Sequence, residues 1–159
     1  MNTKQQLLSM LVSQLVQVLR DIDVSIESTR QEALQAPSRM ESRYDSAKQE
    51  ASYRANELIE RRLHIQDDAK NLEKYMAEGI KQCNAVEEGA LIGVHDDAGK
   101  KSMYFLLPAG QGEILSYPET EEKVFVISTQ SPIASAFMHK QVGDVCAYRD
   151  KKYEIVSIQ

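Results

Sequence analysis

Two carboxylates at a fixed spacing are the first candidates for chemistry in this 159-residue sequence. Glu41 and Asp45 are four residues apart in a segment with helical periodicity, so they share one face of the predicted helix. Glu50 follows five residues after Asp45. Mg²⁺ typically takes only one or two protein carboxylates and keeps several waters. At the end of a rigid arm, these carboxylates are therefore candidate ligands for a Mg²⁺ ion held by a partner.

The same segment also has a purely structural interpretation. Glu41 stands three residues after Ser38, which is the spacing of a helix capping box, and Asp45 lies near the positive end of the helix dipole. Arg39 and Arg43 alternate with these acids. They are interpreted either as ion-pair partners within the helix or as contacts to a partner.

Two long helices must position this segment. Apolar and small residues recur every three or four positions from about Leu7 to Met76, with one interruption at Pro37-Ser38. Both stripes carry small side chains near Pro37 and large ones far from it, as an antiparallel pair requires. The sequence therefore predicts an antiparallel coiled-coil hairpin over residues 1–80. A parallel dimer that tolerates Pro37 within its rod is the alternative.

The period also predicts which residues face the partner helix. In the first helix the large residues end at Ile26, and the predicted seam contains Leu8, Leu11, Leu15, Val18, Ile22, Ser25, Thr29, Glu32 and Ala36. The predicted seam of the second helix contains Met40, Tyr44, Ala47, Ala51, Ala55, Leu58, Arg62, Ile65, Ala69, Leu72 and Met76.

From Gly89 onward the pattern changes to short alternating segments that are typical of strands. Six strands are predicted, at residues 90–94, 103–107, 114–116, 124–129, 144–148 and 153–158. A short helix is expected from Ser131 as N-cap, with Pro132 as its first residue and Phe137 facing the sheet. The fold class is thus α+β, with the hairpin in residues 1–80 and a small sheet domain in residues 81–159.

Composition and cysteine use limit the function classes. The net charge is −5, and residues 87–159 carry seven Lys/Arg against eleven Asp/Glu, which disfavours tight binding to bare nucleic acid. Cys83 and Cys146 are far apart and are expected to be packing residues of a reduced, cytoplasmic protein. No apolar run suits a membrane, and no Walker motif, catalytic triad or metal-ligand spacing is present. We therefore expect no enzyme activity, cofactor or small-molecule substrate for the chain itself.

The sequence around the short helix resembles a known family. Ser131-Pro132-Ile133, the turn Val142-Gly143-Asp144 and the final segment 153–158 resemble the C-terminal signature of the GreA/GreB transcript-cleavage factors. The segment Glu88-Gly89-Ala90-Leu91-Ile92 and Tyr104 resemble the start of the same domain. A helical hairpin before this domain is also the plan of that family, so the resemblance covers nearly the whole chain.

The resemblance implies a fold and a partner. In the family the head has an FKBP-like fold and docks at the rim of the RNA polymerase secondary channel, which the hairpin enters. For this chain it implies polymerase contacts at Ser131, Pro132, Ile133, Gly143 and Asp144, and an indirect action on nascent RNA. The fold alone does not imply prolyl isomerase activity. The apolar residues of the head fit core packing and show no obvious signature of an aromatic-lined pocket.

The resemblance does not extend to the tip. Cleavage factors carry an acidic Gly-Asp-x-x-Glu-Asn segment there, and the nearest equivalent here is Tyr44–Tyr53, with Asp45 and Glu50. We therefore expect a monomeric elongation factor that binds RNA polymerase, with Glu41, Asp45 and Glu50 as candidate ligands for the polymerase Mg²⁺. The alternatives are a polymerase regulator that only competes for the channel and a non-catalytic coiled-coil adaptor.

Overall fold

Two long helices open the chain. The computed structural model describes residues 2–35, 41–120 and 122–159, and the side chains of residues 41–45 lie outside this description. Helix α1 spans Thr3–Gln35 and helix α2 spans Glu41–Glu78. Packing divides the chain into an arm unit, Gln14–Asp68, and a head unit, Met1–Ser13 with Ala69–Gln159. The domain boundary at residue 80, between the hairpin and the sheet domain, was predicted from the change of sequence pattern and stays a prediction.

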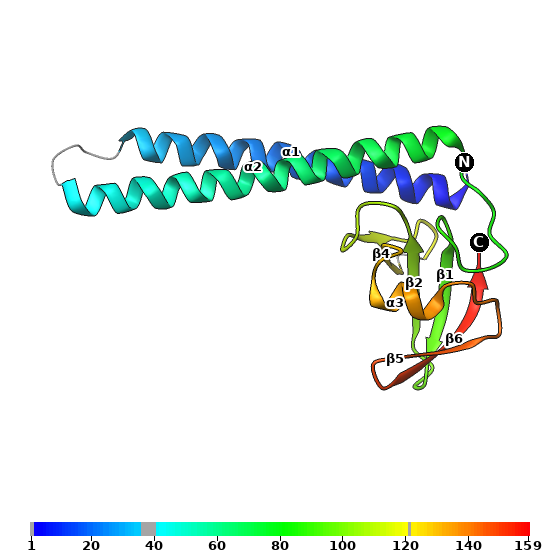
Figure 1. Ribbon diagram of the computed structural model, residues 1–159. Coiled ribbons are helices and arrows are strands. Elements are labelled where there is room, and N and C mark those ends of the chain that lie inside the picture. The colour runs from blue at the N-terminus through cyan, green and yellow to red at the C-terminus, as the bar shows by residue number, and fades with distance from the viewer. Residues whose placement is uncertain (1, 36–40, 121) are drawn as a thin grey trace. The chain divides into compact units, whose positions relative to one another are not determined.

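In the arm unit, α1 and α2 run side by side in opposite directions (Figure 1). Their seam buries Leu15, Ile22 and Ile26 of α1 and Ala51 of α2. Arg62, a predicted seam position, is half-buried because its Nε donates to Asp23 Oδ1 across the helices at 2.6 Å. The predicted helical hairpin is thus confirmed, while its turn at Pro37-Ser38 lies outside the described residues.

The predicted seam is wrong at two positions of α1. Ser25 and Glu32 are exposed, and the seam passes instead through Ile26 and Ala33. A straight α-helix has 3.6 residues per turn, so its buried stripe drifts away from a strict 3.5-residue repeat. Burial of Ile26 rather than Ser25 also removes more apolar surface from water.

The C-terminal part of the chain forms one six-stranded sheet with the order β3-β4-β2-β1-β6-β5. All neighbouring strands are antiparallel except β2 and β4, which are parallel. The strands are β1 (Leu91–Asp96), β2 (Lys101–Leu106), β3 (Ile114–Ser116), β4 (Lys123–Ile127), β5 (Val145–Tyr148) and β6 (Lys151–Ile158). Every predicted strand is confirmed, and short turns join β1 to β2 and β5 to β6.

Helix α3 (Pro132–Phe137) covers one face of this sheet (Figure 1). Ser131 is its N-cap, and the Ser131 Oγ accepts a hydrogen bond from the backbone N of Ala134 at 3.3 Å. Phe137 is fully buried and its ring lies 5.7 Å from that of Tyr104 and 5.9 Å from that of Tyr153. The predicted capped helix and its inward-facing Phe137 are therefore confirmed.

The beginning of α1 is anchored within the head unit. Lys4 is only 1% exposed, and its Nζ donates to the backbone oxygen of Lys81 at 2.7 Å. Gly110, with φ +78°, lies against the side chains of Leu11 and Leu72, where a side chain would have little room. None of the helices in the described part of the chain combines the length and hydropathy that a bilayer crossing requires.

Candidate functional site

The charged tip residues lie at the start of α2. The backbone of Glu41, Arg43 and Asp45 is helical, and their side chains lie outside the described residues, as does Arg39 altogether. Glu50 is described and exposed. Backbone position alone places Glu41 and Asp45 one helical turn apart, as the sequence predicts.

A small hollow separates the two helices near this end of the arm unit. Its walls include the small side chains Ala33, Ala47 and Ala51, and its volume is about 110 Å³. Lys48 and Arg54 lie at the same hollow. The narrow seam predicted near the tip is therefore present, because alanines leave space that larger side chains would fill.

Ser131, Pro132 and Ile133 form the entry to α3. The Ser131 hydroxyl donates to the backbone oxygen of Ser128 at 2.8 Å and also caps the helix, so it is fully engaged within the head. Pro132 is exposed and Ile133 is half-buried. Of the three predicted contact residues, Pro132 and the outer part of Ile133 are thus available to a partner.

Gly143 and Asp144 form the turn before β5. Gly143 has φ +94°, a conformation that favours glycine, and its N donates to the backbone oxygen of Ile155 at 2.8 Å. Asp144 is exposed, and its Oδ2 accepts from the backbone N of Gln141 at 2.8 Å. Gly143 and Asp144 therefore have a structural role, because both stabilise the turn before β5. Their predicted contact with a partner is separate from this role.

Two exposed valines flank this turn. Val142, in the turn, is 57% exposed. Val145 is 59% exposed and lies on β5, an edge strand of the sheet. Helix α3 packs against β5, so both predicted contact segments belong to the same part of the head. An apolar pair beside an exposed carboxylate is a suitable surface for a protein partner.

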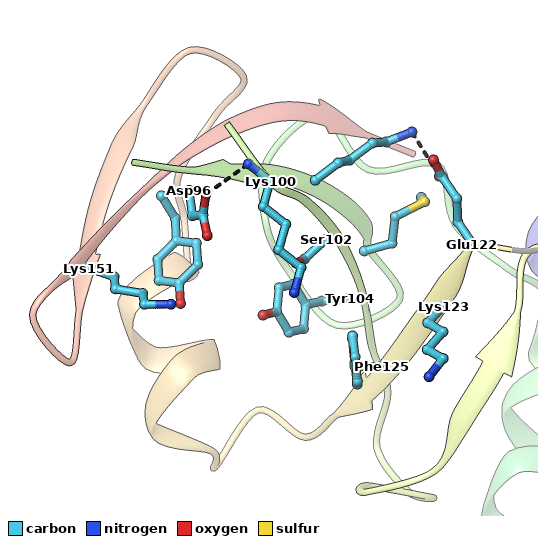
Figure 2. A pocket seen from close by; sticks show the side chains of 11 residues that line it. Asp96, Lys100, Ser102, Tyr104, Glu122, Lys123, Phe125 and Lys151 are labelled. Atoms are coloured by element: carbon cyan, nitrogen blue, oxygen red, sulfur yellow. Dashed lines mark hydrogen bonds and ion pairs between the residues drawn. The ribbon is translucent and has the colours of Figure 1, made fainter. Parts of the chain in front are cut away.

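The head also contains a hollow that the sequence analysis missed. It has a volume of about 500 Å³, and Figure 2 shows the side chains around it. Its lining includes the aromatic residues Tyr104, Phe125 and Tyr153 and the lysines Lys100, Lys101, Lys123 and Lys151. The head thus contains an aromatic-lined hollow for which no obvious signature was recognised in the sequence. Lysine and aromatic residues two positions apart in β4 and β6 are the signal that the sequence contained.

The two cysteines are packing residues, as predicted. Cys83 and Cys146 are free and buried, and burial raises the pKa of both thiols. The Lys4 ammonium, 3.9 Å from Cys83 Sγ, opposes this rise at Cys83. Among the described residues, no group of three or more His, Cys, Asp or Glu side chains is placed to hold a metal ion.

Comparison with known proteins supports the resemblance seen in the sequence. Residues 81–159 match the family model for the C-terminal domain of the transcription elongation factors GreA and GreB. No curated protein shows significant similarity to the chain. Among solved structures, the GreA factor homolog 1 (Gfh1) of Thermus thermophilus is 17% identical, with 93% of this chain and 94% of that chain covered and a TM-score of 0.38. A second structure, of the transcription factor Gfh1, is 18% identical, with 93% and 92% covered and a TM-score of 0.40.

The family match coincides with the sheet domain described above. It includes all six strands, α3, and the turn at Gly143. The C-terminal domain of the chain, residues 81–159, therefore belongs to the GreA/GreB family of transcription elongation factors.

Proposed function

We propose that this protein binds RNA polymerase through its head and modulates transcription elongation from the secondary channel of the enzyme. The observation that carries the proposal is the match of residues 81–159 to the GreA/GreB C-terminal domain. The two-helix arm would be the part of the protein that enters the secondary channel. The exposed Val142 and Val145 provide apolar surface on the head for the polymerase.

The first experiment measures affinity for core RNA polymerase by gel shift at micromolar protein. Val142→Glu and Val145→Glu each place a charge where an apolar contact is expected, so we expect roughly tenfold weaker binding for each. Ser116→Glu is the matched control, because Ser116 is exposed on β3, at the opposite edge of the sheet. Failure of the wild-type protein to bind at these concentrations would refute the proposal.

The tip is the proposed chemical part. Asp45, with Glu41 or Glu50, would add ligands to a Mg²⁺ held by the polymerase's own carboxylates, and the metal would stabilise transition-state charge during RNA cleavage. Arg39 and Arg43 would contact RNA phosphates or acidic groups in the channel, with a strength that decreases with salt. This part of the proposal rests on the sequence of the tip.

A backtracked polymerase complex tests the tip separately. Asp45→Asn removes the charge and keeps the side-chain shape, so we expect loss of stimulated RNA shortening with unchanged polymerase affinity. If the wild-type protein binds the polymerase but never shortens RNA, the metal-ligand role is wrong. Binding in the channel would then act by competition with other factors, and the first part of the proposal would stand.

A further inference from the structure

The hollow in Figure 2 is built by a repeated pattern in the sheet. Three strands each contribute two side chains that are two positions apart and therefore lie on one face. The pairs are Ser102 and Tyr104 of β2, Lys123 and Phe125 of β4, and Lys151 and Tyr153 of β6. Tyr104 lies directly opposite Phe125 in the register of β2 and β4, and their rings are 5.8 Å apart.

The aromatic side chains leave part of their surface open to the hollow. Tyr104, Phe125 and Tyr153 are half-buried, whereas Phe137 behind Tyr104 and Tyr153 is completely buried. Burial of Tyr104 raises the pKa of its phenol, with a smaller contribution from Tyr153, so the ring stays uncharged at neutral pH. The floor of the hollow is therefore a neutral aromatic surface. The volume of the hollow, about 500 Å³, lies within the size range of small-molecule sites.

Positive charge is concentrated around this floor. Residues 87–159 contain seven Lys/Arg, and four of them line the hollow. Lys101 is neutralised by Glu122, whose Oε2 lies 2.9 Å from its Nζ. Among the described residues, Lys100, Lys123 and Lys151 make no ion pair. In Figure 2 the side chain of Lys100 extends toward Tyr104.

The second carboxylate of the hollow does not cancel these charges by pairing. Asp96 Oδ1 accepts hydrogen bonds from the backbone N of Ala98 at 3.0 Å and of Lys100 at 2.8 Å, which form the turn between β1 and β2. Asp96 therefore holds the turn that presents Lys100. Three ammonium groups that pair with no carboxylate among the described residues, beside an aromatic floor, form an unusual local environment in a domain with net negative charge.

We propose that this hollow binds a nucleoside phosphate. The base would stack against Tyr104 and Phe125, and the phosphates would pair with Lys123, Lys151 and Lys100. An inorganic anion would use the lysines and leave the aromatic floor unused. An uncharged apolar ligand would leave the three ammonium groups without partners. A nucleoside phosphate uses both, and it reaches the hollow either as a free nucleotide or as the terminal residue of a single-stranded nucleic acid.

NMR titration of the full-length ¹⁵N-labelled protein tests the proposal. ATP, GTP and a short single-stranded oligonucleotide are compared with inorganic pyrophosphate and with an acidic peptide. Binding is expected to shift the amide resonances of residues 101–104, 123–125 and 151–153, and to saturate. Saturation by ATP or GTP identifies a free nucleotide, whereas saturation by the oligonucleotide alone identifies a strand end. Both outcomes support the proposal.

Matched variants locate the ligand. Lys123→Gln and Lys151→Gln each remove one charge-assisted contact and should weaken binding roughly tenfold. Phe125→Leu keeps an apolar side chain and removes the stacking surface, with a similar loss. Lys152→Gln is the control, because Lys152 is adjacent to Lys151 and exposed but does not line the hollow. Melting temperatures verify that each variant is folded. If Phe125→Leu is unfolded, the affinities of Lys123→Gln and Lys151→Gln test the proposal.

Four results would overturn the proposal. The first is the absence of saturable shifts with any nucleotide or oligonucleotide at millimolar concentration. The second is equal affinity for pyrophosphate and nucleotide, which would show that the aromatic floor is not used. The third is tighter binding of the acidic peptide, which would make the hollow a protein-docking site. The fourth is an equal loss of affinity in Lys152→Gln and Lys151→Gln.

Discussion

Gly89 shows how a single backbone position constrains the connection between α2 and β1. Its φ is +95°, and its N donates to the backbone oxygen of Leu106 at 2.7 Å. A Cβ at this position would collide with the hydroxyl oxygen of Tyr75. That hydroxyl is buried with no hydrogen-bond partner in the described structure, and burial raises the pKa of the phenol. The positive φ at position 89, for any residue with a side chain, and the unpaired hydroxyl of Tyr75 each carry a free-energy cost, and both occur where these two residues touch.

We predict that Gly89→Ala destabilises the protein by about 2 kcal/mol, because it adds backbone strain and a collision. Tyr75→Phe removes the colliding oxygen and a buried unpaired hydroxyl, so Tyr75→Phe alone should be neutral or stabilising. In the double variant we expect recovery of about 1 kcal/mol. Chemical denaturation measures all three. Gly99→Ala, with φ +76° and open space around it, controls for strain alone, and an equal loss there would contradict the collision.

Lys4 is a second residue whose environment sets its behaviour. Burial lowers the pKa of its ammonium, while Cys83, through its hydrogen bond and its charge as a thiolate, and the Glu87 carboxylate oppose this shift. A lysine with a lowered pKa in the folded state binds fewer protons there than in the unfolded chain. Folding stability therefore increases with pH from the lowered value up to the ordinary lysine pKa of about 10.4.

Comparison of the wild-type protein with Lys4→Met tests this linkage. The difference in unfolding free energy, wild type minus variant, should rise as the pH increases from 8 to 10. Tyr75 is retained in both proteins, whereas Cys83 lies 3.9 Å from Lys4 and titrates together with it, so the difference reports the Lys4–Cys83 pair. Gln5→Met, at an exposed neighbouring position, should show no such trend. A flat difference would mean that Lys4 is charged at no cost in the folded state.

At the scale of elements, α1 and α2 stabilise each other through one narrow seam. In the arm unit the large buried residues Leu15, Ile22 and Ile26 are all on α1. The described residues of α2 that face them are mostly small or half-buried, such as Ala51 and Ala55. Since an isolated helix pair has no other core, each large seam residue contributes a substantial part of the stability.

We therefore predict a large effect for Ile22→Ala and a small one for Val24→Ala. Ile22 is 4% exposed, so its truncation leaves a cavity and should cost about 3 kcal/mol. Val24 is 70% exposed on the same helix, and its truncation should cost less than about 0.5 kcal/mol. Thermal unfolding followed by circular dichroism at 222 nm distinguishes the two. Similar melting temperatures for both variants would show that the seam is not the stabilising contact.

At the scale of the whole molecule, the chain consists of an arm unit and a head unit that each have their own packing. The arm unit satisfies its seam within one chain, through α1 and α2. A second copy is therefore not needed to cover the apolar stripe that the sequence shows. This property separates the intramolecular hairpin from a dimeric coiled coil.

Sedimentation velocity at several concentrations tests this conclusion. We expect a sedimentation coefficient that corresponds to an 18.0 kDa monomer and does not change with concentration. A coiled-coil adaptor that dimerises through residues 7–76 would instead show a coefficient that rises with concentration. Ile22→Ala should weaken such a dimer, whereas a protein that is already a monomer should remain one.

The sequence determined the elements of this protein because their signals are local. The three-to-four spacing of apolar residues predicted both helices, alternation predicted all six strands, and Ser131-Pro132 predicted the start of α3. The segment from Ser131 to Asp144 also carried the resemblance to the GreA/GreB family. The exact seam was not determined by the sequence, because Ile26 and Ser25 are adjacent and only packing of α1 on α2 selects one of them.

Tertiary structure decided the composition of the surfaces. Lys100, Tyr104, Phe125 and Tyr153 are separated by up to 53 positions, and only the strand order β4-β2-β1-β6 brings them to one hollow. Burial of Lys4 likewise depends on its contact with Lys81, 77 positions away. Such contacts depend on pairing between distant segments, and the periodicity within each segment carries no information about its neighbours. A net charge of −5 for the chain therefore gave no sign of the local positive cluster on the head.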